Sequence, residues 1–399
     1  MRNINTLEIP QECLSDPVVP PEYQQVYDSM TQFLTSPIFN PPVTYIPMQF
    51  GLHIITASAG IEFWDVAGSN EMYSDAPAHY DLATHKLMID MAKEIGIDYI
   101  QIRTRYPDNN YVPGAEEALH GAIQYAKSKG IDIYLMFIPE GLEHLHIPYG
   151  DSAAFMQKFY DFAAEYITAY KPQYYQLYGQ AQIKRSIGVN TDDLLPEMYA
   201  AIKSASPSTL YVEAEGANLA SQVTRFKALC NIPYNDVMGI PLHDLYSTTY
   251  LQNLQDMIQY ARSKNRVLIC PDAWLTDAHL DKPWELMFNP GWREPLDRDY
   301  MGKVVNFAQS AGLSAISSFY GNHFVSYNPG FFYPVTHMDS SVWVSCLKNG
   351  SRTTLPQAYK SVIDKVRSSA VSESYALYAV IGILGTLGAA AILYKILRR

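Results

Sequence analysis

Four carboxylate side chains end or follow short apolar segments of the chain, at positions where acids could act on a bound substrate. Glu140 follows one segment and Asp272 ends another, while Glu213 and Glu215 lie two residues apart in a third. A pair of carboxyl groups about 5 Å or more apart, one protonated and one ionised, hydrolyses glycosidic bonds. The best candidate pair is Glu213 or Glu215 with Asp272, and Glu140 is a third candidate. The alternative left open is that these acids are buried partners of an arginine such as Arg103.

Eight apolar segments rich in Ile, Val, Tyr and Leu predict the strands that position these acids. They are residues 48–56, 98–106, 132–139, 173–179, 209–216, 236–243, 266–272 and 314–321. Stretches with 3.6-residue periodicity separate them, for example 116–130 and 249–264, and several end in Lys or Gly as helices do. Continuous apolar strands alternating with helices predict a parallel sheet covered by helices. Eight such units favour an α/β fold with a closed (β/α)8 barrel, a TIM barrel, and a doubly wound open sheet is the alternative.

The reacting groups of such barrels stand at the C-terminal ends of the strands. Besides the acids, the side chains expected there to bind substrate are Arg103, Arg105, Gln180, Gln182, His243, Asp244, Trp274, Tyr320, Asn322 and His323. Because side chains alternate along a strand, Glu213 and Glu215 share one face, which is expected to point into the barrel. His53, His243 and His323 lie on three separate strands without a metal-binding spacing, so neither a metal nor another cofactor is expected.

Aromatic residues make up 13% of the chain, and tyrosine accounts for 31 of them. An aromatic ring with a polar tip suits sugar-binding clefts, although ordinary core and surface positions use it as well. Trp274, Trp284 and Trp292 lie near the segment predicted as strand seven. They either stack on sugar rings or pack beneath their own loops.

The composition bounds the class of protein. With 399 residues, 48% of them hydrophobic, the chain can bury a sizeable core. A net charge of -11 without a basic run in the body argues against a nucleic-acid partner, because phosphates would be repelled. The four cysteines lack a metal spacing, and Cys230 and Cys270 lie in apolar segments. No disulfide framework is expected, and a Cys13–Cys346 bridge between the two ends of the domain is left open.

Six segments follow one another in an order and spacing that are more specific together than singly. They are IQIRTRYP, AIQYAKSKGIDIYLMFIP, FYDFAAEYITAYKPQYYQLYG, YAAIKSASPSTLYV, LICPDAW and SAGLSAISSFYG. Together they resemble clan A of the glycoside hydrolases, a large group of retaining (β/α)8 glycosidases. The resemblance covers most of residues 48–330.

This resemblance implies two catalytic glutamates, and the chain departs from the pattern at both. The acid/base of the clan stands in an Asn-Glu pair after strand four, and that pair falls here on Gly179 and Gln180. The nucleophile after strand seven falls on Pro271 or, one step along, on Asp272. A glutamine has the shape of the expected acid but no proton to give. The resemblance therefore implies a divergent or inactive glycoside hydrolase.

The C-terminal end of the chain predicts a membrane anchor. Residues 375–394 are 20 positions without a charge, enough to span a hydrocarbon core of ~30 Å as one helix. Lys395, Arg398 and Arg399 follow directly and indicate a cytoplasmic or interior tail, which would leave the barrel outside. No signal peptide is recognisable in residues 1–20, so a tail-anchored protein facing the cytoplasm is the alternative. Gly385 and Ala389 form a small-residue pair through which the helix could pair with a second copy.

These features predict three parts and one interpretation of function. Residues 1–47 form an extended N-terminal arm with one short helix near 23–34, residues 48–370 the barrel, and residues 371–399 the anchor with its basic tail. We interpret the chain as a membrane-anchored, glycosidase-like barrel that recognises carbohydrate at a cell or virion surface. The alternatives are an active O-glycosyl hydrolase with displaced carboxylates and a structural surface protein. Unpaired carboxylates facing each other across the pocket would favour the enzyme, and arginine-bound acids would favour the binder.

Overall fold

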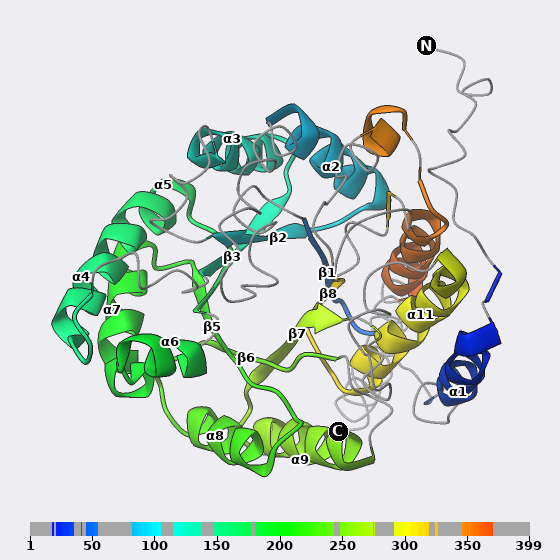
Figure 1. Ribbon diagram of the computed structural model, residues 1–399. Coiled ribbons are helices and arrows are strands. Elements are labelled where there is room, and N and C mark those ends of the chain that lie inside the picture. Colours follow the sequence, from blue (N-terminus) through cyan, green and yellow to red (C-terminus); the bar gives the residue numbers. More distant parts are fainter. Residues whose placement is uncertain are drawn as a thin grey trace, which may run out of the picture.

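The computed structural model describes most of the barrel. The described residues are 18–19, 21–35, 41, 45–54, 82–104, 115–137, 147–177, 180–242, 248–273, 275, 291–318, 324–325, 345–350 and 352–369. They form a closed barrel of eight parallel strands in the order β1 to β8, with helices arranged in a ring around it (Figure 1). The predicted (β/α)8 barrel is therefore confirmed, and the open doubly wound sheet is wrong.

All eight predicted segments contain a strand. The strands are β1 (Gln49–His53), β2 (Tyr99–Thr104), β3 (Asp132–Phe137), β4 (Tyr174–Leu177), β5 (Leu210–Ala214), β6 (Val237–Gly239), β7 (Val267–Ala273) and β8 (Ala315–Ser318). Each pairs in parallel with its neighbours in sequence, and β1 pairs with β8 to close the sheet. Seven of the strands are shorter than the predicted segments, and β7 has the predicted length shifted by one residue.

The helices that cover the strands also follow the predicted periodicity. They are α1 (Gln24–Leu34), α2 (Leu82–Ile95), α3 (Ala115–Ser128), α4 (Ser152–Phe162), α5 (Thr168–Tyr170), α6 (Gln180–Ile187), α7 (Leu195–Ala205), α8 (Ala220–Cys230), α9 (Thr248–Ser263) and α11 (Glu294–Ser310). A π-helical turn, Ala163–Ile167, joins α4 to α5, and short 3-10 turns lie at Pro21–Tyr23, Thr191–Leu194 and Gly291–Arg293. Residues 355–369 are also helical. Gly130 (φ 69°) and Gly312 (φ 65°) follow α3 and α11 in the left-handed conformation that ends a helix at low cost.

Tyrosine rings fill part of the barrel interior. Tyr99, Tyr134 and Tyr174 come from three neighbouring strands, and their ring centroids lie 5.4 to 6.0 Å apart. They pack with Val212 and other small aliphatic side chains in a buried cluster of their own. Gly51 on β1 leaves the room for this packing, since a Cβ there would lie 2.3 Å from Cε2 of Tyr99. The interior is thus a packed core, as expected for a barrel of eight strands.

The larger core lies between the strands and the helices. It includes Phe50, Tyr175 and Tyr211 on the outer face of the sheet, together with the apolar faces of the helices. Phe159 and Phe162 of α4 pack edge-on or tilted against the ring of Tyr175. This alternation of inner and outer side chains along each strand determines which residues reach the barrel interior.

Both ends of the described chain pack against the barrel. The short helix expected in the N-terminal arm is confirmed as α1, which lies beside α11 (Figure 1). Trp292 is buried there and stacks on Tyr23 at 5.8 Å, so this tryptophan packs beneath the N-terminal helix. At the other end, helix 355–369 packs Tyr359 against Phe50 of β1.

The predicted anchor is not part of this description. Residues 375–394 lie outside the described residues, and among the described helices none is both long and apolar enough to cross a bilayer. The membrane span therefore stays a prediction.

One cysteine is in a disulfide. Cys346 is disulfide-bonded, whereas Cys230 and Cys270 are free and buried. The Cys13–Cys346 bridge that the sequence leaves open involves Cys13, which lies outside the described residues. The pairing therefore stays a prediction.

Candidate functional site

Parallel strands bring three of the candidate residues to one end of the barrel. Glu213 is the penultimate residue of β5, Asp272 is the penultimate residue of β7, and Gln180 begins α6 just beyond β4. Because all strands run in the same direction, these positions share the C-terminal end, as predicted.

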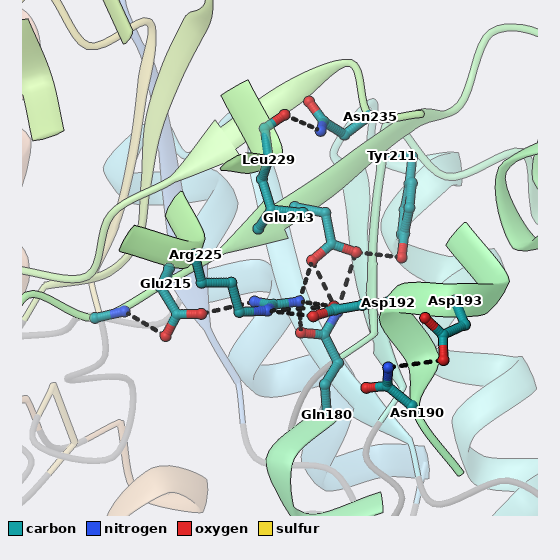
Figure 2. Close-up of polar contacts among 11 residues, drawn as sticks. Gln180, Asn190, Asp192, Asp193, Tyr211, Glu213, Glu215, Arg225, Leu229 and Asn235 are labelled. Carbon is teal, nitrogen blue, oxygen red and sulfur yellow. Dashed lines mark hydrogen bonds and ion pairs between the residues drawn. The ribbon is translucent and has the colours of Figure 1, made fainter. Parts of the chain in front are cut away.

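Glu213 is the most enclosed acid of this group. Its side chain has no exposed surface. The hydroxyl of Tyr211 donates to its Oε1 at 2.5 Å, and Nε2 of Gln180 donates to both carboxylate oxygens at 3.0 and 2.8 Å. Nη2 of Arg225 lies 3.4 Å from Oε2. The carboxylate thus accepts from three different side chains, as Figure 2 shows.

Arg225 on α8 connects these acids to one another. Its Nη1 lies 2.6 Å from Oε2 of Glu215, and its Nη2 lies 2.6 Å from both Oδ1 of Asp192 and Oε1 of Gln180 (Figure 2). Its Nε also donates to both oxygens of Asp192 at 3.2 Å. A planar guanidinium with five N–H donors can serve this many acceptors, whereas a lysine could not. We call Gln180, Asp192, Glu213, Glu215 and Arg225 the Arg225 network.

The orientation of Glu213 differs from the sequence-based expectation. Val212 packs inside the barrel with the tyrosine cluster, so its neighbours Tyr211 and Glu213 face the opposite side. Glu213 is in register with Met238, which belongs to the outer core. The expectation that Glu213 and Glu215 point into the barrel is therefore wrong. The side chains of Glu213 and Glu215 face α8 and the helix layer instead. The sequence-based assignment of inner and outer positions on β5 is off by one residue.

The charges of the network are set by burial and by mutual contact. Burial raises the pKa of the Glu213 carboxyl above its usual value, and Arg225, Gln180 and Tyr211 oppose the rise. Burial also raises the pKa of Tyr211 well above its usual value, so this hydroxyl remains a neutral donor. For Arg225 burial acts to lower the pKa, but hydrogen bonds and charges from Asp192, Glu213 and Glu215 more than offset it. The pKa of the guanidinium is raised, and the group stays charged.

Asp272 lies away from this network. It is 8% exposed, and its backbone oxygen accepts from the backbone N–H of Leu242 at 2.7 Å. The pairing of β7 with β8 is irregular between Cys270 and Ala273, so the backbone around Asp272 departs from regular strand geometry. Among the described residues, no hydrogen bond or ion pair joins Asp272 to Glu213 or Glu215. A catalytic pair needs no direct contact, so the pairing of Asp272 with Glu213 or Glu215 stays a prediction.

Most of the remaining predicted site residues lie outside the described residues. Those are Glu140, Arg105, His243, Asp244, Trp274, Tyr320, Asn322 and His323. Arg103 lies in β2 and Gln182 in α6, but their side chains are not described. His53 ends β1 and is buried. In the part of the chain that the structure describes, no three His, Cys, Asp or Glu side chains are grouped to hold a metal.

Three residues of this site carry little or no sequence signal. Tyr211 could be inferred, since strand alternation places it on the same side as Glu213. Asp192 belongs to an acidic pair in a 3-10 turn, and Arg225 is one of several basic residues on amphipathic helices. Nothing in their spacing relates them to β5. The sequence leaves open an arginine partner for the acids and suggests Arg103, whereas the packing of α8 shows that Glu213 and Glu215 pair with Arg225.

Comparison with known proteins shows the fold. Neither protein-family models nor curated proteins match the chain. Among solved structures, a GH5 xyloglucanase from Bacteroides ovatus in complex with a XXXG heptasaccharide is 11% identical with a TM-score of 0.50, and the match covers 88% of this chain and 80% of that one.

Two further structures are similar over much of their length. A GH5-4 broad-specificity endoglucanase from Clostridium longisporum is 14% identical with a TM-score of 0.49, covering 84% of this chain and 99% of that one. A GH5 xyloglucan-specific endo-β-1,4-glucanase from a metagenomic library, in complex with cellotriose, is 13% identical with a TM-score of 0.49, covering 84% and 98%. The closed barrel of this chain is similar in fold to that of the GH5 xyloglucanase from Bacteroides ovatus.

Proposed function

We propose that this protein is a membrane-anchored, glycosidase-like barrel that binds carbohydrate at a cell or virion surface and does not hydrolyse it by the two-carboxylate route. The observation that carries the proposal is the Arg225 network, in which Glu213 and Glu215 are bound by one arginine on the helix side of the sheet. A carboxylate that is fully buried and turned away from the barrel interior has no path to an anomeric carbon.

Gln180 supports the same conclusion. It stands where the resemblance to clan A places the acid/base, and its amide is engaged on both sides. Its oxygen accepts from Arg225 while its nitrogen donates to Glu213. An amide has no proton to transfer, so this position can orient groups but not protonate a leaving group.

The disulfide supports a barrel that faces outward. Disulfides persist in oxidising compartments and are rare in the cytosol. Cys346 is disulfide-bonded, which agrees with the orientation that the basic tail after residue 394 predicts. The GH5 xyloglucanase from Bacteroides ovatus, a neighbour in fold, was solved in complex with a XXXG heptasaccharide, and carbohydrate is accordingly the ligand class that we propose for the barrel mouth.

The first test measures binding and hydrolysis together on the full chain in a neutral detergent without a sugar headgroup. We expect retention by at least one glycan on an array and no release of nitrophenol from aryl glycosides. Trp274→Ala should weaken retention, because stacking on a sugar ring would be lost. If the protein retains no glycan, the carbohydrate part of the proposal is wrong. Turnover by the wild type that Glu213→Gln or Asp272→Asn abolishes would instead establish the displaced-carboxylate enzyme.

The second test concerns the anchor. Removing residues 371–399 is expected to convert a protein that requires detergent into one that remains in the aqueous phase, because 375–394 is the long uncharged segment of the chain. Phase partitioning of the two forms measures the change. As a control, removing only residues 395–399 should leave partitioning into detergent intact. A truncated protein that still enters the detergent phase would contradict the anchor.

A further inference from the structure

A half-open cavity lies on the outer wall of the barrel, away from the Arg225 network. It occupies about 520 Å³ between α11 and helix 355–369. One wall is a continuous face of α11, from Pro295 through Gly302 to Asn306, and the other is formed by Val362 and Val366. Gly302 keeps the wall open, since even a Cβ there would meet only a Val362 methyl at 3.9 Å.

Three cations line this cavity in a chain that is acidic overall. They are Arg298 and Lys303 of α11 and Lys365 of the opposite helix. Asp299 also lines the cavity and pairs with Lys303 at 2.5 Å, whereas neither Arg298 nor Lys365 forms an ion pair with any described acid. Lys365 lies over the ring of Tyr45 at 5.4 Å, which holds the ammonium near the cavity without neutralising it. The lining therefore carries two uncompensated positive charges beside aliphatic side chains.

This combination indicates the chemistry of a ligand. Arg and Lys side chains that converge in a recess bind phosphate by charge-assisted hydrogen bonds. The volume exceeds what one inorganic phosphate fills, and Val362, Val366 and Pro295 offer contact to an apolar group. A phosphate attached to an apolar body fits both features.

The position of the cavity favours a lipid as the source of that phosphate. Arg367, two residues beyond Lys365, donates to Asp98 Oδ1 at 2.7 Å and to the backbone oxygen of Gly96, just before β2 begins. Helix 355–369 therefore ends at the N-terminal end of the barrel, opposite Gln180 and Glu213. The segment predicted to cross the membrane starts at residue 375, and six residue steps from position 369 span at most ~20 Å. The end of the cavity at Lys365 and Val366 thus lies toward the proposed membrane surface, and the barrel mouth faces away from that surface.

We propose that the cavity between α11 and helix 355–369 binds the phosphate of an anionic phospholipid headgroup in the membrane that carries the anchor. The proposal rests on the membrane-anchored part of the proposed function, but not on carbohydrate binding. Arg298 and Lys365 hold the phosphate from opposite walls, and the valines contact the first carbons of the acyl chains. Such a contact would fix the tilt of the barrel relative to the bilayer.

The test titrates the full chain, in a polyoxyethylene detergent, with dihexanoyl phosphatidylglycerol, dihexanoyl phosphatidylcholine or inorganic phosphate, and follows the change in Tm. We expect saturable stabilisation by phosphatidylglycerol, and weaker effects of the other two. Arg298→Gln and Lys365→Gln should each weaken the apparent affinity roughly tenfold, because each removes a charge-assisted hydrogen bond.

Lys360→Gln is the matched control. Lys360 lies on the same helix as Lys365 and pairs with Asp364 at 3.1 Å, so the variant loses the same charge outside the cavity. It should change the affinity less than twofold. Equal losses of apparent affinity in Lys360→Gln and Lys365→Gln would mean that the lipid responds only to the overall charge of the protein. That result would overturn the proposed site. Inorganic phosphate that binds as tightly as the lipid would overturn the lipid source. Both results are read without glycan, so they are independent of the carbohydrate test.

Discussion

Replacing Arg225 by methionine is expected to lower the free energy of unfolding by about 3 to 5 kcal/mol at neutral pH. The substitution keeps much of the apolar stem of the side chain but leaves Glu213 ionised, fully buried and without its counter-charge. Glu215 and Asp192 lose their closest cation as well. Chemical denaturation of the wild type and the variant measures the difference.

The loss should depend on pH in a defined direction. The pKa of Glu213 is already raised by burial in the folded protein, and removing Arg225 removes the largest influence that lowers it. A carboxyl whose folded-state pKa exceeds its unfolded value binds its proton more tightly in the native state. Stability therefore falls as pH rises between the two pKa values, and the penalty disappears below the unfolded value of about 4.3. We expect the stability difference between Arg225→Met and wild type to be largest above neutrality and to shrink in acid.

Two further variants make this prediction specific. Arg262→Met removes an exposed arginine that donates to the backbone oxygen of Ser310, and it should cost about 1 kcal/mol or less. Adding Glu213→Gln to Arg225→Met should recover part of the lost stability. The buried charge is then gone, and the side-chain amide of Gln180 can rotate by 180° to hydrogen-bond the new glutamine. Additive effects of the two substitutions would contradict the coupling.

Gln180→Glu is the second substitution with a large expected effect. The clan A resemblance makes it the obvious attempt to restore an acid, yet the network predicts instability instead of activity. Nε2 of Gln180 lies 2.8 to 3.0 Å from the two oxygens of Glu213, so the variant sets two carboxyl groups at that separation. Two carboxyl groups at this distance cannot both be ionised without strong repulsion, so they share one proton. Their pKa values then describe the pair and not either residue alone. We expect a loss of several kcal/mol above neutral pH that is regained in acid, and no turnover of aryl glycosides.

Gln222→Glu provides the matched control for added charge. Oε1 of Gln222 accepts from the backbone N–H of Leu219 at the start of α8, three residues from Arg225. A carboxylate makes the same hydrogen bond and is favoured at a helix N-terminus, so stability should be unchanged or slightly higher. Comparable destabilisation in both variants would mean that added charge, not contact with Glu213, is responsible. Turnover by Gln180→Glu would show that the position reaches the barrel mouth after all.

The sequence by itself determined the barrel fold and which candidate residues lie at the C-terminal end of its strands. Continuous apolar segments between stretches of 3.6-residue periodicity locate every strand, because such segments must be covered on both faces. Parallel connection then gathers Gln180, Glu213 and Asp272 at one end. The sequence also shows that Gln180 replaces the acid/base glutamate expected from the clan A resemblance. These properties follow from local chemistry and from the order of elements along the chain.

The tertiary structure decided which way the acids face and what binds them. A shift of one residue along a strand exchanges the side chains that face the barrel interior with those that face the helices. The apolar residues of β5 are compatible with either assignment. Packing does, since Val212 fits among Tyr99, Tyr134 and Tyr174 inside the barrel. Arg225 then meets Glu213 and Glu215 because α8 folds back over β5, a contact that no spacing encodes. Sequence pattern fixes periodicity and order, whereas ion pairs between elements depend on how the elements dock.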